Sequence, residues 1–509
     1  MVRRIPEQYY AIGIAVAFGL VGAIGISHHE MWRDEIQAWL IARDSVSLLD
    51  LARHLKYEGH PILWYVCLMI LTRITRSPTI MQGFHLLIAT ATVYIFARYS
   101  PFNRLQKLLF AFGYFPLYEY GVISRNYGIG VLLLFVSAAL FQRRHAKFLW
   151  VVVVLSLAAH TSIHVLLIVV AIVAALMADF ILTRKTITAQ PPAADRRVWL
   201  GFILVGLAII ASILQMIPPT DSGYAPGWNF TLSIGHLTRV FNLILRGYFP
   251  IPQIRVDFWM EAPLWETSFV SNKVQFVLSA IISAWITLAL LRKPVALLIY
   301  LLGTIGLWGF FYVKDFGYLR HHGLFFIVFL VALWVAHYCS EVRWSNPLDR
   351  LSRVAERSLG PILTLLLIVQ LIGGTIAVAL DYRYAFSHGR TAAEFIDENG
   401  LRDLPILGYR DYRVSTVVGY LDKDQVYYPQ ETRWGSFVLW NTSRRRAMSD
   451  AEIISAAERM QAQRQQDVLL ILDHPLNADE LARGTLSELA RFTGATTEDF
   501  YLYRITAGR

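Results

Sequence analysis

The sequence contains little cysteine and little charge. Its 509 residues include two cysteines, Cys67 and Cys339, and each lies inside an apolar stretch. This excludes a disulfide framework and a cysteine-based metal site. Charged residues make up 17% of the chain, against about 25% in an ordinary soluble domain. This shortage argues against a soluble enzyme, and the hydrophobic share of 55% excludes a disordered chain.

Long hydrophobic runs are abundant, and the mean hydropathy is +0.45. A helix needs about 20 apolar residues to span a bilayer. Several runs are shorter than this, and we expect amphipathic flanks to extend them. We therefore predict a polytopic α-helical membrane protein with about 11–13 transmembrane helices. The runs lie at 9–27, 61–76, 79–97, 108–122, 126–141, 148–159, 161–182, 198–217, 273–291, 295–313, 321–339 and 358–380.

The net charge of +10 is unevenly distributed along the chain. Residues 381–509 carry 16 basic and 19 acidic side chains, so the excess of positive charge lies in the first 380 residues. A basic chain can indicate nucleic-acid binding, but here Lys and Arg gather between apolar runs, as in cytoplasmic loops. We expect no nucleic-acid partner, and we expect a multi-pass protein of the bacterial inner membrane.

The basic loops predict which segments face outward. They place loops 28–60 and 218–272, and everything after residue 380, on the extracytoplasmic or periplasmic side. The assignment fails at one place, because the runs at 61–76 and 79–97 give the wrong parity for Arg98. Either the basic stretch after Arg98 breaks the rule, or one of the two runs does not cross the membrane.

The composition divides the chain into a transmembrane module, residues 1–380, and a small soluble α/β domain, residues 381–509. The second part alternates helix-like and strand-like segments and has no Gly-rich phosphate loop. The expected helices are Thr391–Asn399, Asp450–Gln463 and Ala478–Leu489. The expected strands are Leu404–Tyr409, Gln425–Tyr428, Ser436–Trp440, Asp467–Asp473 and Phe500–Ile505.

Two acidic motifs flank the first outer loop. Met31-Trp32-Arg33-Asp34-Glu35 follows the first span, and Tyr57-Glu58-Gly59-His60-Pro61 precedes the next apolar run. Carboxylates just outside a membrane helix can act as general bases or as metal ligands. Taken alone, each motif also fits a bland interpretation. The first then forms a solvated loop with an Arg33 ion pair, and the second an ordinary loop-to-helix junction.

Together these motifs resemble the GT-C membrane glycosyltransferases, which use polyprenyl-phosphate sugars and include protein O-mannosyltransferases and lipid A aminoarabinose transferases. The resemblance consists of Trp32-Arg33-Asp34-Glu35, an amphipathic stretch over 45–57, and then Glu58-Gly59-His60-Pro61. Ser124-Arg125-Asn126-Tyr127 is similar to the family's Arg-containing junction between two spans. One departure is Ile62, where a second proline is common. The Trp-Trp-Asp signature of the oligosaccharyltransferase branch is also absent, which disfavours asparagine glycosylation.

The resemblance implies an inverting hexosyl or pentosyl transfer at the outer face of the membrane. A sugar would leave a polyprenyl phosphate and join a hydroxyl of a glycan, lipid or protein acceptor of the cell envelope. Asp34 is the first candidate for the catalytic base. Glu35 is the second, and it suits a structural role better. Membrane lipids are further partners. A divalent metal, Mg²⁺ or Mn²⁺, stays open as a cofactor, although the sequence requires none and assigns no metal ligand.

Cations must meet the charge on the departing phosphate. Basic candidates lie at outward junctions, in Ser124-Arg125 and in the segment 314–322, which begins Lys314-Asp315. Charged groups at membrane depth cost several kcal/mol unless paired, and they are often functional. The alternative is headgroup binding by snorkelling side chains. The predicted substrate-binding residues are Glu58, His60, Arg125, Tyr318, Arg320, His321 and His322.

Other functions remain open. His160 and His164, four residues apart, have the spacing of metal ligands, but capping or polar packing explains them better. A transporter or flippase of lipid-linked or small polar substrates would also be polytopic. Transporters tend to carry ionisable groups near the bilayer midplane and repeated halves. Here the ionisable groups gather at one face and no half-repeat is visible. A third possibility is a non-catalytic protein that binds a lipid-linked sugar.

Overall fold

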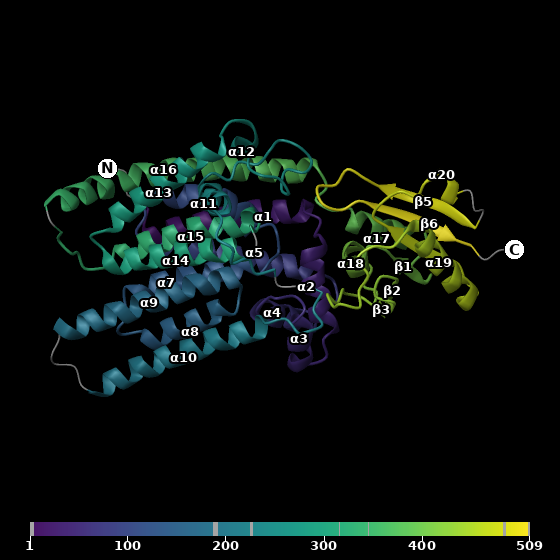
Figure 1. Cartoon of the computed structure of the whole chain (residues 1–509), viewed down its shortest axis with the longest axis horizontal. Coiled ribbons are helices and arrows are strands. Elements are labelled where there is room, and N and C mark those ends of the chain that lie inside the picture. Colours follow the sequence, from purple (N-terminus) through teal and green to yellow (C-terminus); the bar gives the residue numbers. More distant parts are fainter. Residues whose placement is uncertain are drawn as a thin grey trace.

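A computed structural model describes residues 5–186, 192–223, 227–314, 316–344, 346–481 and 485–506. Long helices run side by side and form a bundle, and a smaller α/β domain sits at one end of it (Figure 1). The N-terminus lies toward the opposite end of the bundle, and the C-terminus lies in the α/β domain. We call the end of the bundle that carries the α/β domain the domain face.

The bundle is built from helices that are long and apolar enough to cross a membrane. Eight such helices occur among the described residues, with two shorter apolar helices, α7 (Tyr127–Phe141) and α8 (Phe148–Ala159). The polytopic helical architecture is therefore confirmed. The eight are α1 (Glu7–His28), α5 (Thr79–Tyr99), α9 (Ile163–Thr186), α10 (Pro192–Met216), α13 (Asn272–Leu290), α14 (Pro294–Val313), α15 (Leu319–Ala336) and α16 (Asn346–Arg383).

The apolar run at 61–76 does not form a spanning helix. It contains only α4 (Leu63–Leu71), whose nine residues give a length of about 14 Å, half of the roughly 30 Å core of a bilayer. Of the two alternatives stated for the parity conflict, the structure supports the one in which a run does not cross the membrane, and the conflict at Arg98 then disappears. A chain that crosses in α1 and returns in α5 brings Arg98 back to the starting face.

A second predicted run, 108–122, is divided between two short elements. These are α6 (Arg104–Ala111) and the π-helix η1 (Tyr114–Glu119). π-helical turns are rare and often accompany functional sites. Such short elements explain why fewer long helices form than the 11–13 spans expected. The loop 218–272 likewise forms α11 (Ile234–Tyr248) and α12 (Leu264–Ser268).

Two short helices lie at the domain face between α1 and α4. They are α2 (Arg33–Asp44) and α3 (Leu48–Leu55). The Ser47 hydroxyl caps α3 by accepting the backbone N–H of Asp50 at 3.2 Å. Leu51 and Leu55 of α3 are buried, whereas Leu48 is exposed. The amphipathic helix expected within 45–57 is therefore present.

The α/β domain contains a six-stranded sheet in the order β3-β2-β1-β4-β6-β5. The central strand β1 (Ile406–Gly408) runs parallel to β2 (Val426–Tyr428) and β4 (Val468–Leu472). The other neighbours pair antiparallel: β3 (Arg433–Gly435) with β2, and β6 (Phe500–Ile505) with both β4 and β5 (Leu486–Phe492).

Helices cover both faces of this sheet. Alternate residues of β4 point to opposite sides and all are buried, as expected for a central strand. Leu469 and Ile471 pack with α17 (Gly389–Glu398) and α18 (Asp411–Tyr420). Leu470 and its neighbours pack with α19 (Asp450–Arg464) on the other side.

Two predictions for this domain differ from the structure, and one helix was not predicted. The strand expected at Ser436–Trp440 is not formed, and the strand lies at β3, just before it. Of the helix expected at Ala478–Leu489, the described residues form α20 (Ala478–Leu481), whereas Leu486–Phe492 is a strand that pairs with β6. Helix α18 was not expected, since its valines favour strands locally. In each case tertiary packing overrides the local preference.

Candidate active site

Helix α2 places the two adjacent carboxylates at the domain face. The helix begins at Arg33, directly after the buried Trp32, so Asp34 and Glu35 lie in its first turn. Acidic side chains are stabilised there by the unpaired N–H groups and the positive end of the helix dipole. Glu35 accepts the backbone N–H of Trp32 at 3.2 Å, which fixes the start of the helix.

Asp34 lies among three arginines. Arg125 Nη1 is 2.6 Å from Asp34 Oδ2, and Arg320 Nη2 is 3.8 Å from the same oxygen. The neighbouring Arg33 Nε lies 3.8 Å from Oδ1. Burial opposes ionisation of this carboxyl, but the charges of Arg125, Arg33 and Arg320 outweigh it and lower the pKa of Asp34. Asp34 is therefore a carboxylate at neutral pH, and its side chain remains 30% exposed.

Arg320 is a buried cation whose donors are incompletely used. Its side chain is 8% exposed, and its Nε has no hydrogen-bond partner among the described residues. Aromatic rings surround the guanidinium, with Tyr318, Trp259 and Trp32 centred 4.5, 5.1 and 5.9 Å away. Such rings stabilise a cation without neutralising it. Arg320 therefore retains the capacity to bind an anion.

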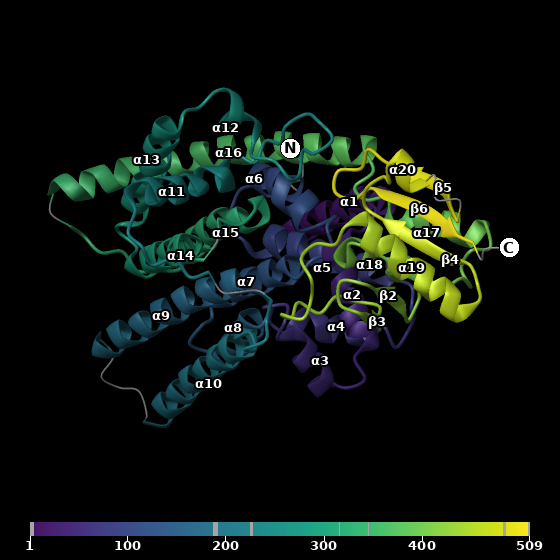
Figure 2. The ribbon, with the colours of Figure 1, turned by 45° about the vertical axis from the view of Figure 1, so that its right-hand side comes forward.

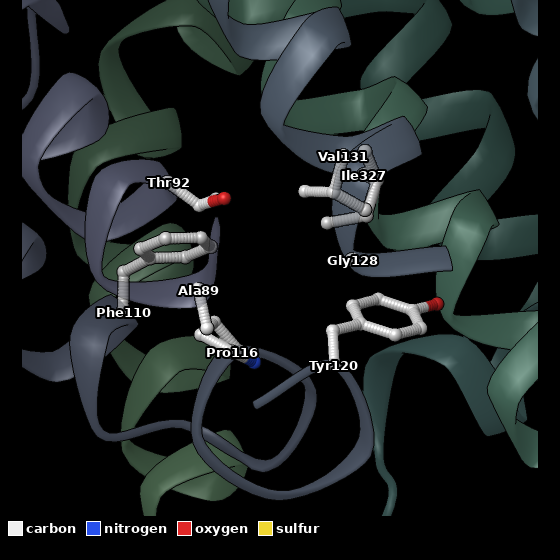
Figure 3. A pocket seen from close by; sticks show the side chains of 8 residues that line it. All are labelled: Ala89, Thr92, Phe110, Pro116, Tyr120, Gly128, Val131 and Ile327. Carbon is white, nitrogen blue, oxygen red and sulfur yellow. The ribbon is translucent and has the colours of Figure 1, made fainter. Parts of the chain in front are cut away.

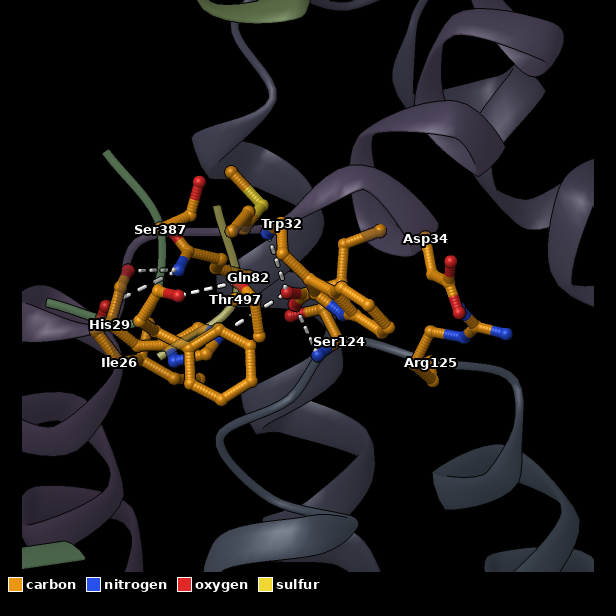
Figure 4. Close-up of polar contacts among 12 residues, drawn as sticks. Ile26, His29, Trp32, Asp34, Gln82, Ser124, Arg125, Ser387 and Thr497 are labelled. Atoms are coloured by element: carbon orange, nitrogen blue, oxygen red, sulfur yellow. Dashed lines mark hydrogen bonds and ion pairs between the residues drawn. The ribbon is translucent and has the colours of Figure 1, made fainter. Parts of the chain in front are cut away.

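Glu35 joins three segments of the chain. Its carboxylate accepts the backbone N–H of Ser124 at 2.6 Å and lies 3.1 Å from Nε2 of His29. His29 Nδ1 is in turn 3.1 Å from Asp381, near the end of α16. Figure 4 shows His29, Trp32 and Ser124 gathered together, while Asp34 and Arg125 face each other beside them. Glu35 was considered as a second candidate base or as a structural residue. It is completely buried, and this geometry favours the structural role.

Glu58 and His60 approach the same site from the other end of the loop. Gln37 Nε2 of α2 donates to Glu58 Oε1 at 2.9 Å, and His60 Nδ1 is 2.8 Å from the Glu58 carbonyl oxygen. Burial raises the pKa of Glu58 to about 7. The hydrogen bond from Gln37 opposes this rise, and the negative charge of Asp34 adds to it.

His60 is held neutral by its surroundings. Burial and the positive charge of Arg125 lower its pKa to about 4. The charges of Asp34 and Arg125 thus act on both Glu58 and His60. The structure therefore brings the two ends of the loop 28–60 together.

The segment 314–322 contributes unequally to the site. Arg320 lies 3.8 Å from Asp34, and the Tyr318 ring packs against the guanidinium of Arg320. His321 Nε2 is 2.8 Å from the Tyr127 hydroxyl, and its ring stacks on His164 at 4.5 Å. His322 is completely buried and is bonded to the Phe316 carbonyl oxygen at 2.7 Å. Asp315 lies outside the described residues.

Two further residues around Arg320, Trp259 and Glu119, were not predicted as site residues from the sequence. Trp259, whose ring covers Arg320, donates its indole N–H to Glu119 of η1 at 3.1 Å. Tyr114 donates to the same carboxylate at 3.0 Å. The aromatic richness of the loop 218–272 was the available signal for Trp259. For Glu119, a single acidic residue inside an apolar run, the sequence offered no such signal.

The residues do not gather into a metal site. Within the described parts of the chain, no group of three or more His, Cys, Asp or Glu side chains could hold a metal ion. The closest contact of Asp34 is with Arg125, and the raised pKa of Glu58, about 7, leaves that carboxyl about half protonated at neutral pH. Coordinating carboxylates must be ionised. A divalent ion at this site would therefore compete with Arg125 for Asp34 and with a proton for Glu58.

The described cavities are small and lie away from Asp34. One, of about 10 Å³, has room for about one water molecule (Figure 3). It is lined by Ala89, Thr92, Phe110, Pro116, Tyr120, Gly128, Val131 and Ile327. The other, of about 90 Å³, lies between α1 and α16 and is lined by residues including Ile24 and Tyr382. Neither could enclose a polyprenyl chain.

Comparisons with known proteins bear on the fold. No protein-family model and no curated protein sequence matches the chain. Among solved structures, the chain is similar to ArnT from Cupriavidus metallidurans, crystallised with undecaprenyl phosphate. The TM-score is 0.50 and the identity 10%, over 98% of this chain and 99% of that chain. ArnT is a GT-C lipid A aminoarabinose transferase. The expected GT-C-like fold, with its C-terminal domain, is therefore confirmed, whereas function depends on the site.

Proposed function

We propose that this protein is an inverting glycosyltransferase that moves a sugar from a polyprenyl phosphate to an acceptor hydroxyl at the outer face of a bacterial inner membrane. The observation that carries the proposal is the ionised Asp34, 2.6 Å from Arg125 and beside the buried Arg320, at the domain face of a GT-C-like bundle. The similar fold of ArnT, crystallised with undecaprenyl phosphate, supports a polyprenyl donor.

Arg125 and Arg320 would hold the donor phosphate. A guanidinium presents a planar fork of donors that matches a phosphate, and Arg320 has an unused Nε. Both arginines are buried, so their interaction with an anion is less screened than it would be in water. As the bond between the sugar and the phosphate breaks, negative charge grows on the leaving oxygen, and the two cations would stabilise it.

Asp34 would act as the general base. The acceptor hydroxyl gives its proton to the Asp34 carboxylate while its oxygen forms a bond to the anomeric carbon. The bond from that carbon to the phosphate oxygen breaks, and the electron pair leaves with the polyprenyl phosphate. The arginines that lower the pKa of Asp34 weaken it as a base. A phosphate bound to Arg125 and Arg320 would offset their charge and restore part of its basicity.

Turnover tests this proposal directly. The purified protein is reconstituted with undecaprenyl phosphate carrying a radiolabelled sugar, and with lipid and glycan extracts of the cell envelope as acceptors. We expect release of undecaprenyl phosphate with label on a new product. Mass spectrometry of envelope glycans from a deletion strain identifies the sugar and the acceptor. Movement of labelled lipid across sealed vesicles without any covalent product would instead support a flippase. Binding without either outcome would support a non-catalytic protein.

A further inference from the structure

The α/β domain packs directly on the helix that carries Asp34. Helix α18 lies beside α2 in both views of the ribbon (Figures 1 and 2). A Cβ atom at Gly419 of α18 would stand 2.3 Å from Cγ2 of Ile36 in α2, closer than real Cβ contacts allow. Only glycine therefore permits this approach. The domain is in close packing contact with the first outer loop.

One carboxylate of the domain reaches the first residue of α2. Both Oε atoms of Glu498 lie 3.3 Å from the backbone nitrogen of Arg33, which donates to them. The Glu498 side chain is completely buried and also accepts the hydroxyls of Ser387 at 2.9 Å and Thr416 at 3.0 Å. Glu498 thus caps a helix that lies 465 residues away in the sequence.

We infer that Glu498 is a positioning residue, through which the α/β domain fixes the first turn of α2 and so aims Asp34 at Arg125 and Arg320. This inference rests on the proposed transferase function. Asp34 directly follows Arg33, so a shift of the Arg33 backbone moves the reacting carboxylate. A misplacement of about 1 Å can cost a hundredfold in rate.

Two carboxylates hold this turn from different parts of the chain. Glu35 binds the Trp32 N–H and, through Ser124, the segment that carries Arg125. Glu498 binds the next N–H, that of Arg33, from the α/β domain. Asp34 follows the two N–H groups that are held, so the first turn cannot rotate without breaking a bond to one side or the other.

Further hydrogen bonds between the α/β domain and this loop also hold α2 in place. The Tyr420 hydroxyl of α18 accepts the Met31 N–H at 2.8 Å. Gln37 of α2 donates to the Val438 carbonyl oxygen at 2.8 Å and accepts the Val438 N–H at 3.1 Å.

A buried carboxylate is costly unless it is well bonded. Burial raises the pKa of Glu498 to about 7, against the opposing effect of Arg33 and the two hydroxyls.

The test compares Glu498→Ala with Glu498→Gln in the full-length protein. Glutamine keeps an acceptor for the Arg33 N–H, whereas alanine removes it. Hydrogen exchange of the backbone amides of residues 33–36 should speed up about tenfold in Glu498→Ala and much less in Glu498→Gln. The matched control is Glu452→Ala. Glu452 accepts the Ser449 N–H at the start of α19, within the α/β domain. This change should leave exchange in α2 unaltered.

Turnover then separates positioning from mere folding. We expect kcat to fall by about tenfold to a hundredfold in Glu498→Ala, with KM for the donor nearly unchanged and with partial rescue by glutamine. Unchanged exchange at residues 33–36 would contradict the positioning role of Glu498 while leaving the transferase proposal intact. Faster exchange with unchanged kcat would show that Glu498 holds the first turn of α2 but does not position Asp34 for the reaction. The exchange measurement needs no substrate, so it remains decisive if no donor is turned over.

Discussion

The backbone N–H of Ser124 donates to Glu35 Oε1 at 2.6 Å. This bond joins the residue before Arg125 to the residue after Asp34. One buried carboxylate therefore sets the separation between the acid and the cation of the candidate site. Glu35 could therefore affect a reaction at Asp34, the proposed base, without touching the substrate.

Replacing Glu35 should destabilise the fold. His29 lies between Glu35 and Asp381, and all three side chains are buried. Removing one partner of a buried charged network typically costs about 3–5 kcal/mol. We therefore expect Glu35→Ala to lower the unfolding midpoint in detergent by several degrees. The control Glu394→Ala changes an exposed residue of α17 and should have little effect. A midpoint equal to wild type in Glu35→Ala would contradict the assigned role.

Replacing either buried arginine should weaken binding of the donor phosphate. Arg125→Gln and Arg320→Gln each remove one charged donor group, worth about 1.5–3 kcal/mol, which is about tenfold to a hundredfold in affinity. Titration with undecaprenyl phosphate measures this change. Arg76→Gln is the control, because Arg76 pairs with Asp422 on the surface of the α/β domain. If all three variants bind equally well, the phosphate lies elsewhere.

The contribution of Glu58 to the stability of the protein should fall as the pH rises through the range between about 4.5 and 7. Burial raises the pKa of Glu58 from 4.5 to about 7. In this window the unfolded chain has lost the proton that the folded chain keeps, so the folded state binds more protons and stability declines with pH. Above pH 7 this contribution is constant.

Glu58→Gln tests this titration, since glutamine cannot ionise. Unfolding midpoints measured at pH 5 and pH 8 should differ less in Glu58→Gln than in wild type. Part of the difference should persist, because burial also raises the pKa of Glu498 to about 7. The exposed Glu398 provides a control whose replacement by glutamine should leave the difference unchanged. An unaltered pH dependence in Glu58→Gln would mean that Glu58 is ionised in the folded protein at both pH values.

Close packing around the π-helix should be sensitive to one methyl group. A Cβ atom at Gly323 of α15 would stand 2.2 Å from Cε1 of Phe115 in η1, whereas Gly309 of α14 has open space at this position. Overpacking costs about 1–3 kcal/mol, so Gly323→Ala should lower the unfolding midpoint. Gly309→Ala should be neutral or slightly stabilising, because alanine favours helix over glycine. Equal effects of the two substitutions would contradict the packing.

Local patterns in the sequence predicted much of the bundle and part of the site. Apolar runs marked the long helices because a bilayer demands continuous apolar length. Asp34 and Glu58 were recognised because each lies beside such a run, and the structure brings both near Arg125. The run at 61–76 misled because hydropathy does not distinguish a short helix from a spanning one, and α4 has only nine residues.

Other features depend on partners that are distant in the sequence. Glu498 faces Arg33 only after the α/β domain has docked, and no local pattern marks such a pair. Strand β5 forms because β6 pairs with it, although its sequence allows a helix. The role of Glu35 depends likewise on His29 and Ser124. Long-range pairing of this kind is invisible to periodicity within a single segment.

The most direct measurement of the central claim is the turnover of Asp34→Asn. Asparagine keeps the shape of the side chain but cannot take up the acceptor proton, and general-base catalysis contributes about a hundredfold to ten-thousandfold. We predict a fall of this size in kcat with undecaprenyl-phosphate-linked sugar, while undecaprenyl phosphate still binds. The matched variant Asp257→Asn, which alters an exposed ion pair with Arg255, should retain its activity. Wild-type turnover by well-folded Asp34→Asn would contradict the assignment of Asp34 as the base.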